Sequence, residues 1–312
     1  FKRCMVHFAV DDARVKFCTK LDGKNSWFLP FDKGYNDGAG NPPNPDGLMT
    51  DYLWKKILTK DKLSRIIENY AQVVVEEDPE TKKKSVKQIF PRYHQLDCVE
   101  KLLADVKTNG VGKRYLIQHS AGSGKSNSIA WLAHQLIGLE KNGHPMIDSV
   151  LVVTDRRILD KQIRDNIKQF MQVANTVAWA EHSGDLRKAI QAGKRIIITT
   201  VEKFPYVVPD IGAAHKTNHF AVIIDEAHSG QNGRNSAQMN LALSGLASED
   251  EMDNEDKINA MMEGRKLLPN ACYFAFTATP KNKTLETFGT LVVDENGNPV
   301  LNEDGEAQHR PF

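Results

Sequence analysis

Residues 114–126 join an apolar segment to a small-residue loop that ends in Gly124-Lys125-Ser126. Glycines in such a loop let successive backbone N–H groups converge on phosphate oxygens, and the following helix adds the positive end of its dipole. Lys125 is placed to reach the β- and γ-phosphates of a nucleotide, and Ser126 to bind Mg2+. The sequence therefore predicts a nucleotide site made by Ala121, Gly122, Ser123, Gly124, Lys125 and Ser126.

The strict phosphate-loop pattern has glycine five residues before Gly124, whereas this chain has His119 there. A short glycine-rich string that ends in Lys-Ser also occurs as an ordinary turn. The context favours the phosphate loop, because a predicted strand precedes it and an amphipathic helical pattern follows it. His119 leaves the detailed geometry of the loop open.

A second acidic motif, Asp225-Glu226-Ala227-His228, follows an apolar segment far downstream of the loop. Asp225 is suited to hold Mg2+, directly or through water, and Glu226 is placed to polarise an attacking water. An acidic pair at a strand end also occurs as plain solvent-facing polarity. The phosphate loop favours the catalytic interpretation, so the predicted catalytic residues are Lys125, Asp225, Glu226 and His228.

Length and composition describe a chain of 312 residues, with room for roughly two domains of about 150 residues each. Its 41 basic and 40 acidic residues leave a formal charge of +1, so any polyanion site must be a local patch. The four cysteines form no Cys-x-x-Cys pair, which argues against zinc and for buried, reduced thiols. With no apolar run of about 18 residues and no signal peptide, we expect a cytoplasmic protein without membrane contact. A first residue Phe1 rather than Met indicates a piece of a longer polypeptide.

The start of the chain contains three short β-prone segments, 4–10, 14–20 and 26–31, separated by turn residues. This spacing predicts an antiparallel meander. Two further β-prone arms, 72–76 and 85–90, flank a charged turn and predict a hairpin.

Between the meander and the hairpin, residues 32–47 are rich in glycine and proline, which excludes regular structure. Two interpretations of this segment stay open, a functional loop and a plain connector. Two helices are expected after it, the first capped by Thr50 and the second by Asp61.

Two apparent metal motifs are rejected. Glu80-Thr81-Lys82 has the Glu-x-Lys spacing of metal-dependent nucleases, but it lies in a polar turn rather than on an apolar strand. Asp294, Asn296 and Asn298 match the first three ligand positions of a Ca2+ loop, but Pro299 and Gly305 stand where that loop needs glycine and glutamate. A hairpin turn at Asn296-Gly297 is the better interpretation.

From residue 91 the pattern changes to continuous apolar segments that alternate with helical ones, such as 126–141 and 157–172. Strands that are apolar on both faces belong to a buried parallel sheet, so we predict a three-layer α/β domain. The predicted strands are 114–118, 149–154, 195–200, 219–225 and 272–277. Ligands of such sheets bind beyond the carboxyl ends of the strands, where the chain has Thr154, Thr199, Thr200, Asp225 and Thr277.

In their order these motifs resemble the first motor lobe of superfamily 2 helicases and translocases, which has a RecA-like parallel sheet flanked by helices. Phe90-Pro-Arg-Tyr-His-Gln95 is similar to the Q motif, in which the glutamine amide reads adenine. Thr154-Asp155-Arg156-Arg157 and Thr199-Thr200 resemble the motifs that face the nucleic-acid backbone, and Thr277-Ala278-Thr279 resembles the motif that links them to the ATP site. The resemblance implies an ATP- and Mg2+-dependent motor. It adds Arg92 and Gln95 to the nucleotide site, and it assigns DNA or coupling roles to Asp155, Arg156, Arg157, Thr199, Thr200, Thr277 and Thr279.

A narrower resemblance, to the R (HsdR) subunit of type I restriction enzymes, covers nearly the whole chain. It rests on the segments 90–95, 225–231 and 277–283, and on Gly38-Ala-Gly-Asn-Pro42 with Tyr52-Leu-Trp54. It implies a motor that pulls double-stranded DNA through a complex with modification (M) and specificity (S) subunits. Cleavage is assigned to a separate nuclease domain, which has no match in this chain.

The resemblance also implies a division of the chain into four parts. Residues 1–75 are the C-terminal part of a nuclease-side domain, 76–90 a hairpin linker, 91–290 the RecA-like lobe, and 291–312 a tail hairpin toward a second lobe. The arginine residues of a second lobe have no match here, so the fragment is expected to hydrolyse ATP poorly. Two other interpretations stay open, namely a general superfamily 2 helicase and, from another class, a docking module that binds ATP as a conformational signal.

Overall fold

A computed structural model describes residues 4–36, 38–77, 81–82, 84–120, 122–154, 177–180, 183–200, 217–225, 270–302 and 305–312. The chain divides into two compact units, Phe1–Leu102 and Leu103–Phe312. The dividing line falls inside helix α2 (Tyr93–Asn109). The division of function between 76–90 and 91–290 stays a prediction.

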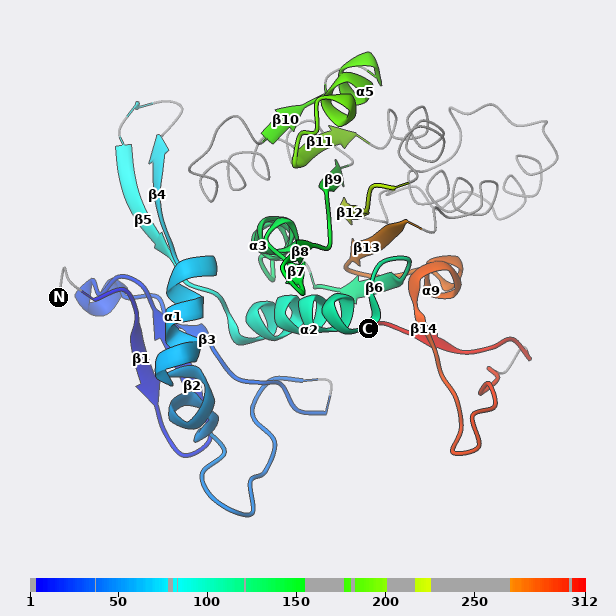
Figure 1. Ribbon diagram of the computed structural model, residues 1–312. Coiled ribbons are helices and arrows are strands. Elements are labelled where there is room, and N and C mark those ends of the chain that lie inside the picture. Colours follow the sequence, from blue (N-terminus) through cyan, green and yellow to red (C-terminus); the bar gives the residue numbers. More distant parts are fainter. Residues whose placement is uncertain are drawn as a thin grey trace. The chain divides into compact units, whose positions relative to one another are not determined.

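The first unit begins with the predicted antiparallel meander, which is confirmed. Strands β1 (His7–Val10), β2 (Val15–Cys18) and β3 (Leu29–Pro30) lie in the order β1-β2-β3 (Figure 1). The turn between β1 and β2 forms because the Asp11 carboxylate accepts hydrogen bonds from the backbone N–H groups of Ala13 and Arg14. Those two bonds lower the pKa of Asp11.

Aromatic side chains from distant parts of the sequence form the core of the first unit. Their ring centroids lie 5.3 to 6.4 Å apart, mostly edge to face, which is the favoured geometry of aromatic pairs. The Tyr52 hydroxyl donates to the carbonyl of Phe31 at 2.7 Å, so its polar end is satisfied inside this core. The cluster consists of Phe8, Phe17, Phe31, Tyr52, Phe90 and Tyr93.

Both expected helices are present, but their caps are not the predicted ones. Residues Leu53–Ile57 form one π-helical turn, labelled η2, and the Thr50 hydroxyl instead donates to the Asp11 carbonyl at 2.8 Å. Helix α1 (Lys60–Asn69) begins after Thr59, so Asp61 lies in its first turn. In the first turn, the positive end of the helix dipole attracts the Asp61 carboxylate, which stabilises the helix.

The glycine- and proline-rich segment 32–47 is held in place by one buried side chain. Asn41 is 1% exposed; its amide donates to the Ala13 carbonyl and the Asp32 carboxylate, and its oxygen accepts from the Lys33 N–H. Asp32 also accepts from Arg14 at 3.0 Å. The segment is therefore tied to the meander, whichever role it has.

The hairpin predicted over 72–90 is confirmed as β4 (Gln72–Glu77) and β5 (Lys84–Ile89), paired antiparallel from Gln72↔Ile89 to Glu77↔Lys84. Exposure alternates along the middle of β4, whereas β5 is exposed from Lys84 to Lys87. Val74 is buried, whereas Val73, Val75 and Val86 are exposed.

The second unit contains a six-stranded parallel sheet with the order β10-β11-β9-β12-β13-β6. All five predicted strands are present. They are β6 (Arg114–Gln118), β9 (Ser149–Thr154), β11 (Ile196–Thr200), β12 (Phe220–Asp225) and β13 (Ala271–Thr277). Strand β10 (Val177–Trp179) and helix α5 (Ser183–Gln191) were not predicted. A three-residue strand such as β10 leaves no periodic pattern.

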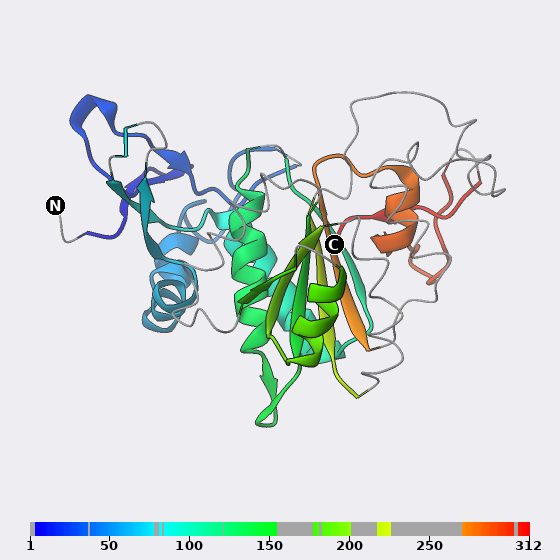
Figure 2. The same cartoon turned by 90° about the horizontal axis from the view of Figure 1, so that it is seen from above.

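Helices cover both faces of this sheet, which confirms the RecA-like three-layer class. Helix α3 (Lys125–Ile137) lies on one face, and α9 (Asn282–Phe288) lies on the other (Figure 2). The α3 residues predicted to face the core, Ile129, Leu132, Ala133 and Leu136, are all fully buried. The four inner strands, β11, β9, β12 and β13, are buried along their whole length, as the continuous apolar runs require, whereas the edge strand β6 is exposed at both ends.

Helix α3 is shorter than the predicted 126–141, because Gly138 follows it and residues 140–145 form a tight hairpin of β7 (Glu140–Lys141) and β8 (His144–Pro145). The predicted helix 157–172 lies outside the described residues. In the tail, β14 (Thr290–Leu291) pairs with β15 (His309–Arg310), and the Asp294 carboxylate accepts from the N–H groups of Asn296 and Asn298. That turn supports a hairpin in place of a Ca2+ loop.

Within the described ranges, no helix is long and apolar enough to cross a membrane. Cys18 and Cys272 are buried as predicted, whereas Cys4 is exposed, and all four thiols are free. Among the described residues there is also no group of three or more His, Cys, Asp and Glu side chains that could hold a metal ion.

Candidate nucleotide-binding site

The predicted phosphate loop connects β6 to α3 at the carboxyl edge of the parallel sheet. Gly122 and Gly124 have φ values of +74° and +85°, the left-handed region that favours glycine. At Gly122 a Cβ would meet nothing within 4 Å, so backbone conformation rather than space requires glycine there. Gly124 is the N-cap residue of α3, so the loop delivers its backbone N–H groups at the positive end of that helix.

Lys125 and Asp225, two of the predicted catalytic residues, lie together in the folded chain. The Lys125 Nζ atom is 3.2 Å from the Asp225 Oδ1 atom, and the two side chains are 16% and 1% exposed. Lys125 is the first residue of α3, whereas Asp225 is the last residue of β12. A carboxylate this deeply buried is costly unless a positive charge offsets its loss of hydration.

The carboxyl edge of the sheet also gathers the predicted threonines. Thr200 lies opposite Thr154, and Thr277 lies opposite Gln118 at the start of the loop. Thr154, Thr199, Thr200 and Thr277 are each at most 5% exposed, and the Thr154 hydroxyl donates to the Thr199 carbonyl at 3.5 Å. Thr279, in contrast, is exposed. Of the predicted coupling residues described here, Thr279 is therefore the one whose side chain is open to a partner.

Several predicted site residues lie outside the described part of the chain. They are Ala121, Asp155, Arg156, Arg157, Glu226 and His228. Their assigned roles stay predictions.

Gln95, which is predicted to contact adenine, also has a role in capping helix α2. It is 3% exposed and lies in the first turn of α2, where its Oε1 atom accepts a hydrogen bond from the Arg92 N–H at 2.9 Å. A side chain at the third helical position that reaches back to the N-cap N–H forms half of a capping box. Arg92 and Gln95 are thus brought together as a helix start.

His119 is a polar member of the loop whose contacts the sequence did not reveal. Its backbone N–H donates to the Thr277 carbonyl at 2.7 Å, and its Nδ1 atom lies 2.9 Å from the Ser123 hydroxyl. The sequence signal that could have pointed to these contacts is the histidine itself, because it stands at the loop position where the strict pattern has glycine.

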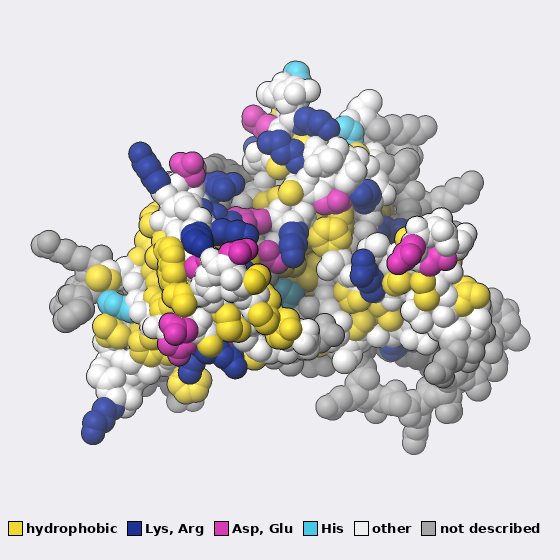
Figure 3. All heavy atoms as spheres, turned by 90° about the horizontal axis from the view of Figure 1, so that it is seen from below, with side chains coloured by type: hydrophobic (Ala, Val, Ile, Leu, Met, Phe, Trp, Pro, Cys, Tyr) yellow, Lys and Arg dark blue, Asp and Glu magenta, His cyan; other side chains and the backbone are white. Residues whose placement is uncertain are grey.

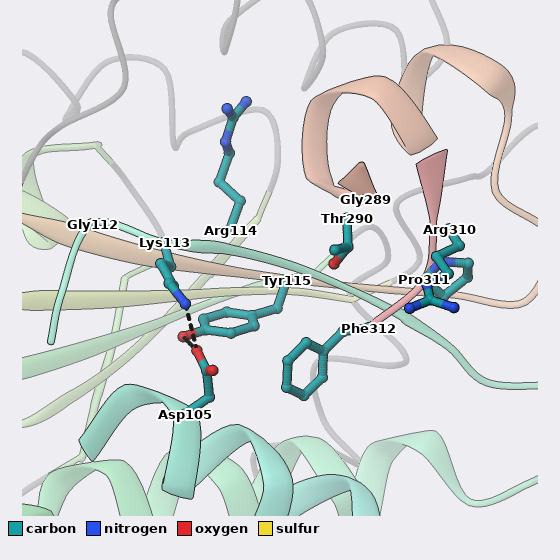
Figure 4. A pocket seen from close by; sticks show the side chains of 10 residues that line it. All are labelled: Asp105, Gly112, Lys113, Arg114, Tyr115, Gly289, Thr290, Arg310, Pro311 and Phe312. Atoms are coloured by element: carbon teal, nitrogen blue, oxygen red, sulfur yellow. Dashed lines mark hydrogen bonds and ion pairs between the residues drawn. The ribbon is translucent and has the colours of Figure 1, made fainter. Parts of the chain in front are cut away.

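A separate hollow of about 850 Å3 lies at the amino end of β6 (Figure 4). There Lys113 and Tyr115 both reach Asp105, at 3.2 and 2.8 Å, while the Arg114 side chain points away. Burial raises the pKa of the Tyr115 hydroxyl, and its bond to Asp105 raises it further. No residue of the predicted nucleotide site lines this hollow.

On the face drawn in Figure 3, the Lys and Arg side chains lie among Asp and Glu side chains rather than in one continuous basic field. This mixed distribution agrees with the nearly neutral composition. Any contact with a polyanion must therefore be made by a small local group of basic side chains.

Comparison with known proteins identifies relatives of this chain. Residues 94–295 match the sequence profile of the SWI2/SNF2 ATPase. The HindI type I restriction enzyme endonuclease subunit of Haemophilus influenzae is 27% identical over 228 residues, which are 67% of this chain and 19% of that protein. The C-terminal part of the putative MpnIIP type I endonuclease subunit of Mycoplasma pneumoniae is 27% identical over 161 residues, 46% of this chain and 73% of that protein.

Two solved structures are also similar to this chain at low identity. The UvsW helicase from bacteriophage T4 has a TM-score of 0.41 and 13% identity over 74% of this chain and 66% of that one. The Type ISP restriction-modification enzyme LlaBIII, solved bound to DNA, has a TM-score of 0.43 and 15% identity over 72% of this chain and 16% of that one.

Proposed function

Since the chain belongs to the SWI2/SNF2 ATPase family, we propose that it is the ATP-hydrolysing lobe of a motor that moves double-stranded DNA, within the R subunit of a type I restriction enzyme. The observation that carries the ATPase part is the Lys125–Asp225 ion pair at 3.2 Å. It joins the phosphate loop to the second acidic motif across a sheet in which β13 separates their strands. The restriction-enzyme part draws on the similarity to the HindI and MpnIIP endonuclease subunits.

The residues of the site fit a nucleotide and a divalent cation. Backbone N–H groups of the loop, with Gly122 and Gly124 in the left-handed region, suit phosphate oxygens. The Ser126 hydroxyl and the Asp225 carboxylate are the oxygen ligands that would hold Mg2+. When bound, Mg2+ neutralises charge that develops on the phosphates.

The ion pair suggests how Lys125 and Asp225 change partners. Without nucleotide, Lys125 compensates the buried charge of Asp225. With Mg2+ held by Asp225 and Ser126, the Lys125 ammonium would be able to contact the β- and γ-phosphate oxygens. Glu226 follows Asp225 directly and orients the attacking water.

The larger assembly is part of the same proposal. The chain spans 19% of the length of the H. influenzae relative. We assign the nuclease activity and a second motor lobe to other parts of a longer R subunit, and we propose that this subunit assembles with separate M and S subunits. We assign 1–75 to the nuclease side, 76–90 to a linker, 91–290 to the motor lobe and 291–312 to a tail toward the second lobe. Such a complex works in the cytoplasm, and residues 1–312 alone should hydrolyse ATP slowly.

The experiment for this function compares movement with strand separation in the full-length protein. A translocase should displace a third strand from duplex DNA with ATP, while a strand-separation assay shows no unwinding. Unwinding of duplex DNA or RNA would favour the general superfamily 2 helicase. Absence of ATP hydrolysis with and without DNA would favour the ATP-sensing docking module.

Gln95 provides a prediction that separates adenine reading from helix capping. Gln95→Glu keeps an oxygen for the Arg92 N–H but loses the amide donor, whereas Gln95→Ala loses both. We expect Gln95→Glu to keep its unfolding midpoint and to lose about tenfold in preference for ATP over GTP, which is about 1.4 kcal/mol. Gln95→Ala should lose that preference and also about 1 kcal/mol of stability. Unchanged ATP preference in both variants would leave Gln95 with the capping role alone.

The DNA contacts give a prediction about salt. If Arg156 and Arg157 each bind one phosphate, replacing either with alanine should lower the slope of log affinity against log salt by about 0.9. Duplex DNA binding is measured over a series of salt concentrations. Lys188, exposed on α5, serves as the matched control. Slopes that match wild type for both arginine variants would exclude those phosphate contacts.

A further inference from the structure

His119 is attached to three places around the phosphate loop. Its backbone N–H donates to the Thr277 carbonyl at 2.7 Å, and its ring lies 5.8 Å from the Phe276 ring, tilted by 58°. Its Nδ1 atom is hydrogen-bonded to the Ser123 hydroxyl at 2.9 Å. The first two attachments are to the carboxyl end of β13, and the third crosses the loop. The His119 side chain is 5% exposed, so these contacts lie in a largely dry environment.

Ser123 lies between the two glycines of the phosphate loop. Its neighbours Gly122 and Gly124 both have positive φ, and glycine loses more conformational freedom on ordering than any other residue. The Ser123 N–H donates to the Ser120 carbonyl at 3.1 Å, so the backbone bond and the His119 bond hold this residue from two sides. A loop whose N–H groups are already fixed binds phosphate without a further ordering cost.

We propose that His119 is a positioning residue that fixes the shape of the phosphate loop through Ser123 and ties that shape to the carboxyl end of β13. The tie reaches Thr277, which begins the Thr277-Ala278-Thr279 segment. A shift of that segment would move the loop with it. This inference rests on the proposed ATPase function. It explains how the position of the phosphate loop depends on the position of the Thr277-Ala278-Thr279 segment.

Three substitutions separate the parts of this contact. His119→Phe keeps a ring against Phe276 and removes the nitrogen, while His119→Asn removes the ring and keeps a polar atom near the Nδ1 position. Ser123→Ala removes the hydroxyl alone. Mg·ATP binding is measured with a fluorescent ATP analogue, and KM and kcat of DNA-stimulated hydrolysis are measured in the full-length protein.

We expect His119→Phe and Ser123→Ala each to weaken ATP binding by about tenfold, a typical size for one lost coupling between neighbours. The double variant should be no weaker than either single one, because both remove the same bond. KM should rise far more than kcat falls, since neither side chain touches the reacting atoms, and His119→Asn should recover most of the affinity. A merely structural contact would lower the unfolding midpoint and leave KM unchanged.

Equal affinity in wild type, His119→Phe and Ser123→Ala overturns the inference, as do fully additive losses in the double variant. Lys125→Ala, measured beside them, reports on the proposed function itself. If Lys125→Ala is inactive while the His119 and Ser123 variants bind ATP normally, only this inference fails. If Lys125→Ala keeps full activity, the nucleotide site is assigned wrongly. His144→Ala, on the exposed hairpin of β7 and β8, controls for loss of any histidine.

Discussion

Replacing Lys125 with alanine should reduce DNA-stimulated ATP hydrolysis of the full-length protein to about 1% of wild type or less, since one well-placed charge on a reacting group is worth roughly 100- to 1,000-fold. The Lys125 Nζ atom lies in the site itself, 3.2 Å from the carboxylate proposed to hold Mg2+. Because Asp225 is 1% exposed and would lose this partner, the variant should also lose about 1 to 3 kcal/mol of unfolding free energy. Circular dichroism and a denaturant titration would show that it still folds.

Lys113→Ala is the matched control for this variant. Lys113 also forms an ion pair of 3.2 Å with an aspartate, Asp105, in the same unit, but at the amino end of β6. Its removal should leave ATP hydrolysis near the wild-type rate. Hydrolysis that survives in Lys125→Ala would refute the role assigned to Lys125.

Replacing Asp225 with asparagine should reduce hydrolysis by roughly 100- to 1,000-fold and raise the Mg2+ concentration needed for what remains. Asparagine keeps the shape of the side chain and removes the charge that suits Mg2+. Binding of ATP in the presence of EDTA should persist, because Lys125 no longer has Asp225 as a competing partner and is available to the phosphates. The measurements are ATPase rate against Mg2+ concentration and binding of a fluorescent ATP analogue.

Asp105→Asn is the control for the aspartate, because Asp105 also accepts from a lysine but lies away from the predicted site. Combining Lys125→Ala with Asp225→Asn closes a double-mutant cycle. Strong non-additivity in rate is expected, since both residues serve one site. A normal Mg2+ dependence in Asp225→Asn would show that another group holds the metal.

The strands and the chemistry at their ends could be predicted from the sequence. Apolar runs such as 149–154 and 220–225 are continuous, and such runs occur in parallel sheets that are buried on both faces. The phosphate loop could be predicted because its glycines, lysine and serine are adjacent in the chain. The short strand β10 left no such signal, since three residues are too few to show a period.

Helix caps were less predictable, because neighbouring polar residues compete for them. Thr50 had the side chain of a cap, yet it bonds to the Asp11 carbonyl, a partner far away in the sequence. Helix α1 begins after Thr59, two residues before Asp61, although the Thr59 side chain makes no capping hydrogen bond and donates to the Lys56 carbonyl instead. A local pattern does not contain the information that decides between a near partner and a distant one.

By itself, the sequence determined which residues carry chemistry and that they stand at strand ends. The tertiary structure alone decided which of them meet. The order β12-β13-β6 places the end of β12 near the start of α3, so Asp225 pairs with Lys125. It also puts the end of β13 beside His119, whose ring then bonds to Ser123. Strand order depends on how whole strands and helices pack against one another, and the residues of any one motif do not encode it.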